Sequence, residues 1–185
     1  AMSKVYIIAE AGVNHNGSLD LGYRLIEGAK AAGADAVKIQ TFKTESIIRE
    51  GTEKAAYQKQ ATGAGESQYE MLKRLELGTE EHHALRKRCR EIGIDFLSTP
   101  FDLESLDLLV KELGLSTLKI ASGEITNGPL LLAAARSGAD LILSSGMSDL
   151  DDIRAALGVL AFGLTGRSAP GTAAFRAAFA SEEGK

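Results

Sequence analysis

The sequence has little cysteine, no excess of basic residues and no long apolar run, and each absence excludes a class of protein. Its single cysteine, Cys89, cannot build a disulfide framework. A formal net charge of -4 and a pI near 5.5 leave no basic field for nucleic acid. No apolar run reaches the roughly 18 residues needed to cross a bilayer, and the N-terminal AMSKVYIIAE lacks the basic region and long apolar stretch of a secretory signal. We expect a cytoplasmic protein that binds neither nucleic acid nor membrane.

Strand patterns and helical patterns alternate along the chain. With 185 residues and 44% hydrophobic content, the chain suits one globular unit. Short apolar or β-branched runs predict five strands, and helical periodicity predicts helices between them, with caps or first residues at Ser18, Thr79, Asp102, Pro129 and Ser148. A short helix is expected from about Thr172. The strands are predicted at residues 5–12, 34–42, 94–101, 116–124 and 139–146.

This alternation indicates parallel strands joined by right-handed crossovers, in either a doubly wound sheet or a (β/α)8 barrel. No G-x-G-x-x-G follows the first strand, and polar residues gather at the C-terminal ends of the strands, which favours the barrel. A closed barrel needs eight strands and about 250 residues. We therefore expect a TIM-barrel type α/β fold that is truncated after about five βα units. The insertion at residues 44–78, polar and then helical, is expected to cover the mouth.

The polar residues at the strand ends are the candidates for chemistry. Lys38 and Gln40 interrupt the buried-looking run ADAVKIQTF and, being two residues apart, share one side of their strand. There are eight candidates in two groups. Two lysines and three hydroxyl residues suit a phosphate or carboxylate ligand. Two glutamates and one glutamine suit contacts with hydroxyl or amide protons, or a role as a base. Taken singly, each could be a surface ion pair or a backbone contact, and only the constellation favours a site. The first group is Lys38, Thr99, Lys119, Ser122 and Ser144, and the second is Glu10, Gln40 and Glu124.

The histidines and the cysteine carry weaker signals. His82 and His83 are adjacent on a predicted helix without a ligand partner at i+3 or i+4, so we expect solvated surface residues. Cys89 is in register with Leu85 and is expected in the core. His15 lies in the turn NHNGS, where a structural role and a site role are equally plausible.

Several motifs, in order and at characteristic spacing, resemble the sialic acid synthase family, which comprises the bacterial N-acetylneuraminate synthases and their legionaminic and pseudaminic acid relatives. The resemblance covers residues 5 to 163. The motifs are IIAEAGVNHNGSL, VKIQTF, YQKQATGAGESQYEML, FLSTPFD, LKIASGE and LILSSGM.

The resemblance implies a (β/α)8 barrel followed by a small antifreeze-like domain, in a homodimer. It also implies condensation of phosphoenolpyruvate with an N-acetylated amino sugar such as N-acetylmannosamine, with C–O cleavage and release of phosphate, assisted by a divalent metal, Mn²⁺ or Mg²⁺. On this basis residues 1–185 are the N-terminal portion of the barrel, without the antifreeze-like domain and without the metal ligands. We therefore expect the chain alone to be inactive.

The resemblance also implies roles for single residues. Lys38, Thr99, Lys119, Ser122 and Ser144 correspond to phosphoenolpyruvate contacts. Glu10, Gln40 and Glu124 correspond to sugar contacts, with Glu10 the catalytic candidate. The family places an asparagine from the loop after the second strand on the sugar, where this chain reads KQATGAGES, so the sugar is not identified.

Two other functions remain open at this stage. One is a Schiff-base aldolase, because Lys38 and Lys119 stand where barrel aldolases place an amine. The other is a non-catalytic interaction fragment that retains site residues by descent.

Overall fold

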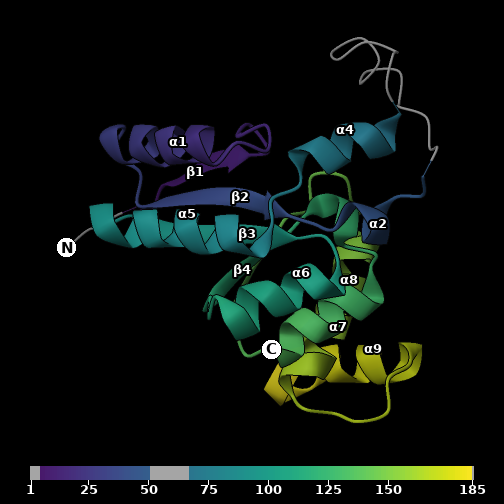
Figure 1. Ribbon diagram of the computed structural model, residues 1–185. Coiled ribbons are helices and arrows are strands. Elements are labelled where there is room, and N and C mark those ends of the chain that lie inside the picture. Colours follow the sequence, from purple (N-terminus) through teal and green to yellow (C-terminus); the bar gives the residue numbers. More distant parts are fainter. Residues whose placement is uncertain (1–4, 51–66, 185) are drawn as a thin grey trace. The chain divides into compact units, whose positions relative to one another are not determined.

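The computed structural model describes residues 5–50 and 67–184, and strands alternate with helices along it (Figure 1). The five predicted strands are confirmed, each shorter than the sequence pattern suggests. They are β1 (Ile8–Gly12), β2 (Ala36–Thr41), β3 (Asp95–Pro100), β4 (Thr117–Ile120) and β5 (Asp140–Leu143).

The predicted helices are also present, and most begin where their caps indicated. Ser18 and Asp102 accept the capping hydrogen bonds expected of them, but the cap of α8 is Asp149 instead of Ser148. The helices are α1 (Leu19–Ala31), α2 (Thr44–Ile47), α4 (Gln68–Leu75), α5 (Thr79–Ile92), α6 (Leu103–Asp107) with the π-helical turn η1 (Leu108–Glu112), the 3₁₀ turn η2 (Ser122–Glu124), α7 (Gly128–Arg136), α8 (Leu150–Leu164), α9 (Thr172–Ala180) and the 3₁₀ turn η3 (Glu182–Gly184).

The chain divides into two compact units, Ala1–Ser98 and Thr99–Lys185, where the length suggested one. The reason is that each group of strands has its own sheet and its own helices. The first sheet has the order β1-β2-β3, and the second pairs β4 with β5. The expected α/β class with parallel pairing is confirmed.

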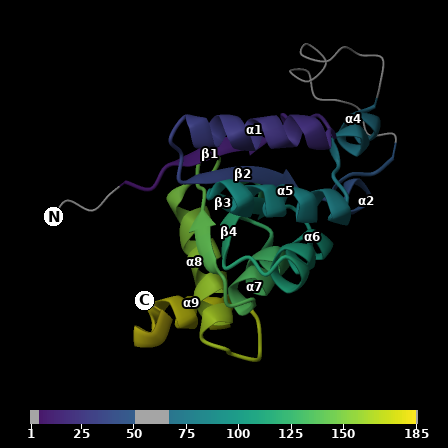
Figure 2. The same ribbon diagram turned by 60° about the vertical axis from the view of Figure 1, so that its left-hand side comes forward.

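In the first unit, β1 pairs in parallel with β2 so that Glu10 stands opposite Lys38. The register shifts between Glu10 and Gly12, where Gly12 takes a positive φ of 54°. Helices α1 and α5 pack on each other and run beside the strands in both views (Figures 1 and 2). Ile26 on α1 and Leu85 on α5 are almost completely buried and belong to the core of the unit.

In the second unit, β4 and β5 pair in parallel, with Lys119 opposite Ile142. Leu118 and Ile120 point to the other face of β4 and are fully buried. Helix α8 packs against both α7 and α9, and Phe162 meets Phe175 edge-to-face with ring centroids 5.1 Å apart. Within the described ranges, no helix is both long and apolar enough to cross a membrane.

Candidate functional site

The centre of the candidate site in the first unit is an ion pair between Glu10 and Lys38. The ammonium of Lys38 donates to Glu10 Oε2 across the β1–β2 ladder, where the two residues are in register. The Lys38 side chain is only 9% exposed, whereas that of Glu10 is 53% exposed. A lysine this deeply buried is costly without an anionic partner. The pair therefore presents a half-exposed carboxylate in front of a buried cation.

Gln40 joins this pair at the bulge of β1. A methyl group placed on Gly12 would lie 3.5 Å from Glu10 Oε1 and 3.8 Å from Gln40 Nε2. The side chains of Glu10 and Gln40 thus flank the same glycine, whose positive φ favours glycine over residues with a side chain. The structure brings together the three candidates of the first unit, Glu10, Lys38 and Gln40.

The candidates of the second unit lie at the C-terminal ends of β4 and β5. Lys119 is half-buried in β4, and burial lowers the pKa of its ammonium. Ser122 and Glu124 form the turn η2 directly after the strand, where Asn127 Nδ2 donates to Glu124 Oε2 at 2.8 Å. Ser144 follows β5, and its N–H donates to Ile120 O at 3.1 Å, which ties the two strand ends together.

Thr99 is 1% exposed, and its Oγ1 has no hydrogen-bond partner in the described part of the chain. Buried hydroxyls are nearly always satisfied in native proteins. An unpaired one therefore fits a group that meets a ligand or an ordered water.

The prediction of solvated histidines is wrong for His82. It is 1% exposed, with Nδ1 2.7 Å from Gly78 O and Nε2 2.9 Å from Thr41 Oγ1. His82 shares the α5 face of Leu85 and Cys89 at i, i+3 and i+7, a spacing that indicated burial. His83 is exposed, as expected.

Cys89 is fully buried, which confirms its core position, and burial raises the pKa of its thiol to about 12. His15 is also buried at 1% exposure, with Nδ1 accepting from Gly17 N at 3.1 Å and Nε2 without a hydrogen-bond partner among the residues that the structure describes. Its burial favours a structural contribution and leaves one donor open to a ligand or water.

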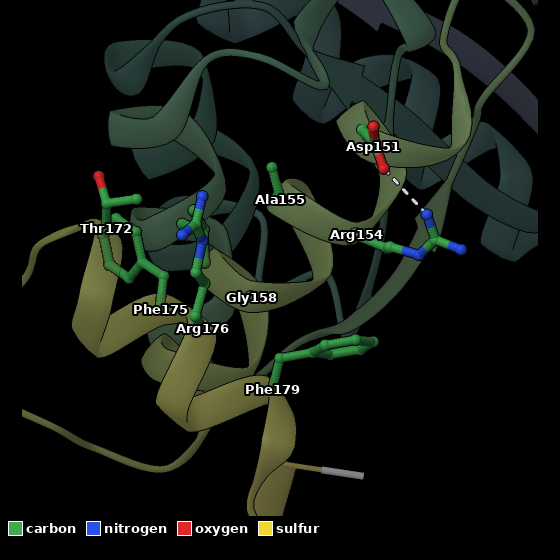
Figure 3. Close-up of a pocket in the computed structure, with 9 residues that line it drawn as sticks. Asp151, Arg154, Ala155, Gly158, Thr172, Phe175, Arg176 and Phe179 are labelled. Atoms are coloured by element: carbon green, nitrogen blue, oxygen red, sulfur yellow. Dashed lines mark hydrogen bonds and ion pairs between the residues drawn. The ribbon is translucent and has the colours of Figure 1, made fainter.

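A separate pocket of about 600 Å³ lies between α8 and α9 (Figure 3). Among the lining residues, Arg154 Nη1 lies 2.9 Å from Asp151 Oδ1 and forms an ion pair with it. The remaining lining residues are Ala155, Gly158, Val159, Thr172, Phe175, Arg176 and Phe179. None of the predicted site residues lines it, so we assign it no part in the predicted chemistry.

Two further predictions concern the loop that would bind the sugar and the ligands of a metal ion. The loop predicted to bind the sugar, KQATGAGES, lies at residues 59 to 67, all but the last of them outside the described residues. Among residues 5–50 and 67–184, no cluster of three or more His, Cys, Asp or Glu side chains could hold a metal ion.

The chain is similar in sequence to two bacterial synthases. It is 51% identical over 152 residues to the N,N'-diacetyllegionaminic acid synthase of Legionella pneumophila, an alignment that covers 82% of this chain and 42% of the relative. It is 52% identical over 159 residues to the enzyme of the same name from Campylobacter jejuni, covering 86% and 47%. The chain thus spans less than half the length of these two relatives.

A solved structure agrees with the sequence relatives. The N-acetylneuraminic acid (sialic acid) synthetase of Leptospira borgpetersenii is 37% identical and superposes with a TM-score of 0.71 over 85% of this chain and 50% of that protein. The family model of NeuB proteins matches residues 25–175. Because that match covers most of the chain, the protein described here belongs to the NeuB family.

Proposed function

We propose that this chain is the N-terminal part of a synthase barrel, with its βα units forming the beginning of a (β/α)8 barrel. Parallel pairing in both sheets, the alternation of strands and helices, and the relatives named above support this organisation. Residues 1–185 would then be one portion of a single catalytic domain.

The proposed reaction condenses phosphoenolpyruvate with an N-acetylated amino sugar to give a nonulosonic acid. C3 of phosphoenolpyruvate attacks the aldehyde carbon of the sugar, whose oxygen takes up a proton to become a hydroxyl. Water adds at C2 and loses a proton, and the tetrahedral intermediate releases phosphate by C–O cleavage. The names of the relatives, legionaminic and sialic acid synthases, support this product class.

The buried Lys38 and its partner Glu10 are the observation that carries the proposal. In the absence of substrate, the Glu10 carboxylate neutralises Lys38. An incoming phosphate or carboxylate supplies a second anion to the same ammonium, which releases Glu10 to contact the sugar or to hold a proton near the reacting carbon. Gln40, beside Gly12, is the proposed partner of a sugar hydroxyl or amide.

For the second unit, the proposed phosphoenolpyruvate contacts are one lysine and three hydroxyl groups. Lys119, Ser122 and Ser144 offer one cationic and two hydroxyl donors at the ends of β4 and β5, and the unpaired Thr99 hydroxyl offers a third. Glu124, whose Oε2 accepts from Asn127, is the proposed acceptor for a sugar hydroxyl or amide. The lowered pKa of Lys119 reflects burial, and an anionic ligand would reverse that cost.

We also propose a divalent metal and a homodimer for the whole protein, on the basis of the family resemblance. No step above depends on that metal, whose ligands we propose lie outside residues 1–185.

The test measures phosphate release from phosphoenolpyruvate. It uses a protein of the relatives' full length that contains these residues, called the longer protein below. The assay contains Mn²⁺ and a panel of N-acetylated hexosamines. Lys38→Ala is expected to lower kcat/KM for phosphoenolpyruvate at least about a hundredfold, because a charged hydrogen bond and its buried cation are lost. The matched control is Lys87→Ala on the exposed face of α5, which should behave like the wild type.

The 185-residue chain is assayed beside these proteins and is expected to be silent. Phosphate release by the wild type with one sugar, lost in Lys38→Ala only, would support the proposal. Silence of the longer protein with every sugar would overturn it.

One observation favours a second candidate, the Schiff-base aldolase. A half-buried lysine whose pKa is lowered by burial, as at Lys119, suits an amine nucleophile. This candidate predicts a pyruvate adduct on Lys119 that borohydride traps and mass spectrometry locates. The synthase proposal predicts no adduct.

A further inference from the structure

We propose that Thr41, held by His82 and Ser98, is a positioning residue that fixes the C-terminal end of β2 and thereby the placement of Lys38 and Gln40. The inference rests on the proposed function, because it assigns to Thr41 the placement of two groups of that site. It concerns the first unit alone, and none of its three members is a candidate substrate contact.

The three side chains form a buried polar chain behind the sheet. Thr41 Oγ1 lies 2.6 Å from Ser98 Oγ on β3 and 2.9 Å from His82 Nε2 on α5. Thr41, His82 and Ser98 are 3%, 1% and 0% exposed. The chain therefore joins β2, β3 and α5 at one point without access to bulk water.

The donors in this chain can be assigned from the carbonyl at its end. Because His82 Nδ1 lies 2.7 Å from Gly78 O, it must donate, and burial keeps the ring neutral. The Nε2 atom of His82 therefore accepts from the Thr41 hydroxyl. Because Thr41 donates its hydroxyl proton to His82, Thr41 Oγ1 accepts from Ser98 at 2.6 Å. Ser98 Oγ also donates to Ile39 O on the neighbouring strand at 3.2 Å, so its single proton is shared between the two acceptors, of which Thr41 is the nearer.

The position of Thr41 on β2 explains how this chain reaches the site. Side chains alternate along a strand, so Thr41 and Ile39 face α5 while Lys38 and Gln40 face the opposite side. Thr41 is the last residue of β2 and directly follows Gln40. Fixing Thr41 from behind sets the backbone from which the two site residues project.

Thr44 adds a second fixed point just beyond the strand. Its N–H and Oγ1–H donate to Glu76 Oε2 at 2.9 Å and 2.8 Å. The segment after β2 is therefore anchored to the end of α4, and Thr41 is the anchor nearest to the site.

Thr41→Val removes the hydroxyl without changing the shape of the side chain, and Thr41→Ser restores the hydroxyl. In the longer protein, we expect Thr41→Val to raise KM for phosphoenolpyruvate about tenfold, because small displacements of binding groups are costly in enzyme sites. Thr41→Ser should return KM to within about twofold of the wild type. A merely structural role would lower the stability of Thr41→Val but leave KM of the folded enzyme unchanged, and that result would overturn the inference.

His82 provides an independent pair of variants. His82→Asn keeps a donor near Gly78 O but cannot reach Thr41, so it should reproduce the rise in KM. His83→Asn, on the exposed neighbour, should not change it. Equal effects at positions 82 and 83 would also overturn the inference.

A readout without turnover separates this inference from the proposed function. Acetylation of lysines by an amine-specific reagent is followed by mass spectrometry, with the exposed Lys87 as internal reference. Labelling of Lys38 relative to Lys87 should rise several-fold in Thr41→Val and stay at the wild-type value in Thr41→Ser. If the wild type releases no phosphate, the proposed function fails, and the Lys38 labelling alone decides whether Thr41 positions that lysine. Labelling of Lys38 that is unchanged in Thr41→Val counts against the inference.

Discussion

His15 and His82 each bury an imidazole in the first unit, and burial is the main cause of the lowered pKa of both. Proximity to His82 lowers the pKa of His15 further. Around His82, the Gly78 carbonyl and Glu81 act in the opposite direction, whereas Lys43 and His83 act in the same direction as burial. Both rings are therefore neutral in the folded protein under conditions where an unfolded histidine begins to protonate.

This difference predicts that the first unit loses stability in mild acid. The unfolded chain binds protons at its histidines below about pH 6.5, and the folded chain does not. The free energy of unfolding contributed by these rings is therefore complete above that pH and falls as the pH drops toward the folded values. Urea denaturation of the chain across this range should show the loss. His82→Gln, which keeps an acceptor for Thr41 without a titrating ring, should show a shallower pH dependence than the wild type. An equal slope in both proteins would contradict the assignment to His82.

At the level of single residues, the sequence predicts which side of a strand a side chain takes when all the evidence lies within that strand. Lys38 and Gln40 were placed on one side of β2 from their spacing alone. The sequence does not predict a contact whose two side chains come from different helices or strands. The Glu10–Lys38 pair depends on the register of β1 against β2. The Thr41–His82–Ser98 chain depends on how α5 packs, which no local pattern specifies.

Helix α8 offers a direct comparison between two neighbouring candidates for its cap. Asp149 accepts from the N–H groups of Asp151 and Asp152 at 2.8 Å and 2.9 Å, and Asp152 Oδ2 accepts from the Asp149 N–H. Ser148 Oγ is buried and has no partner in the described ranges. The negative charges also interact favourably with the helix dipole at this end.

Asp149→Ala should therefore destabilise the second unit by about 1 kcal/mol, the usual value of a lost N-cap. Ser148→Ala serves as the matched control and should be neutral, because it removes no hydrogen bond. Chemical denaturation of the two variants beside the wild type measures both changes. The reverse order of effects would show that Ser148 caps the helix after all.

The one-residue error at α8 shows what sequence patterns leave open at the level of elements. Both Ser148 and Asp149 are good cap residues, and each has an aspartate three positions on, so composition alone does not choose between them. Where one candidate stood alone, as at Ser18 and Asp102, the prediction was confirmed. Helix ends that lack competing caps are thus the more predictable ones.

For the molecule as a whole, the number of strands was readable from the sequence, but their grouping into two sheets was not. Alternation of apolar and polar runs indicates that a strand exists, whereas pairing is decided by contacts between residues far apart in the chain. Length and composition suggested one unit, but they do not show which residues contact one another, and those contacts divide the chain into two units.

Apolar side chains on the surface give the last prediction, which concerns association. Val5, Ile7, Met147, Leu150 and Leu164 are between 54% and 80% exposed. In the described sheets, β1 and β3 border the first, and both strands of the second are edges. Unpaired strand edges beside exposed apolar groups are templates for contact with another chain.

We therefore expect the 185-residue chain to associate with itself, and its thermal midpoint to rise with protein concentration, because an assembly that forms only from folded chains stabilises them by mass action. Thermal denaturation at two protein concentrations, with sedimentation velocity on the same samples, measures both effects. A cooperative transition at the same temperature from a monomer at both concentrations would mean that these edges and side chains are tolerated in water. If the longer protein is instead a single defined species, monomer or dimer, in sedimentation velocity at both concentrations, the exposed groups are covered by the additional residues, as the barrel proposal requires.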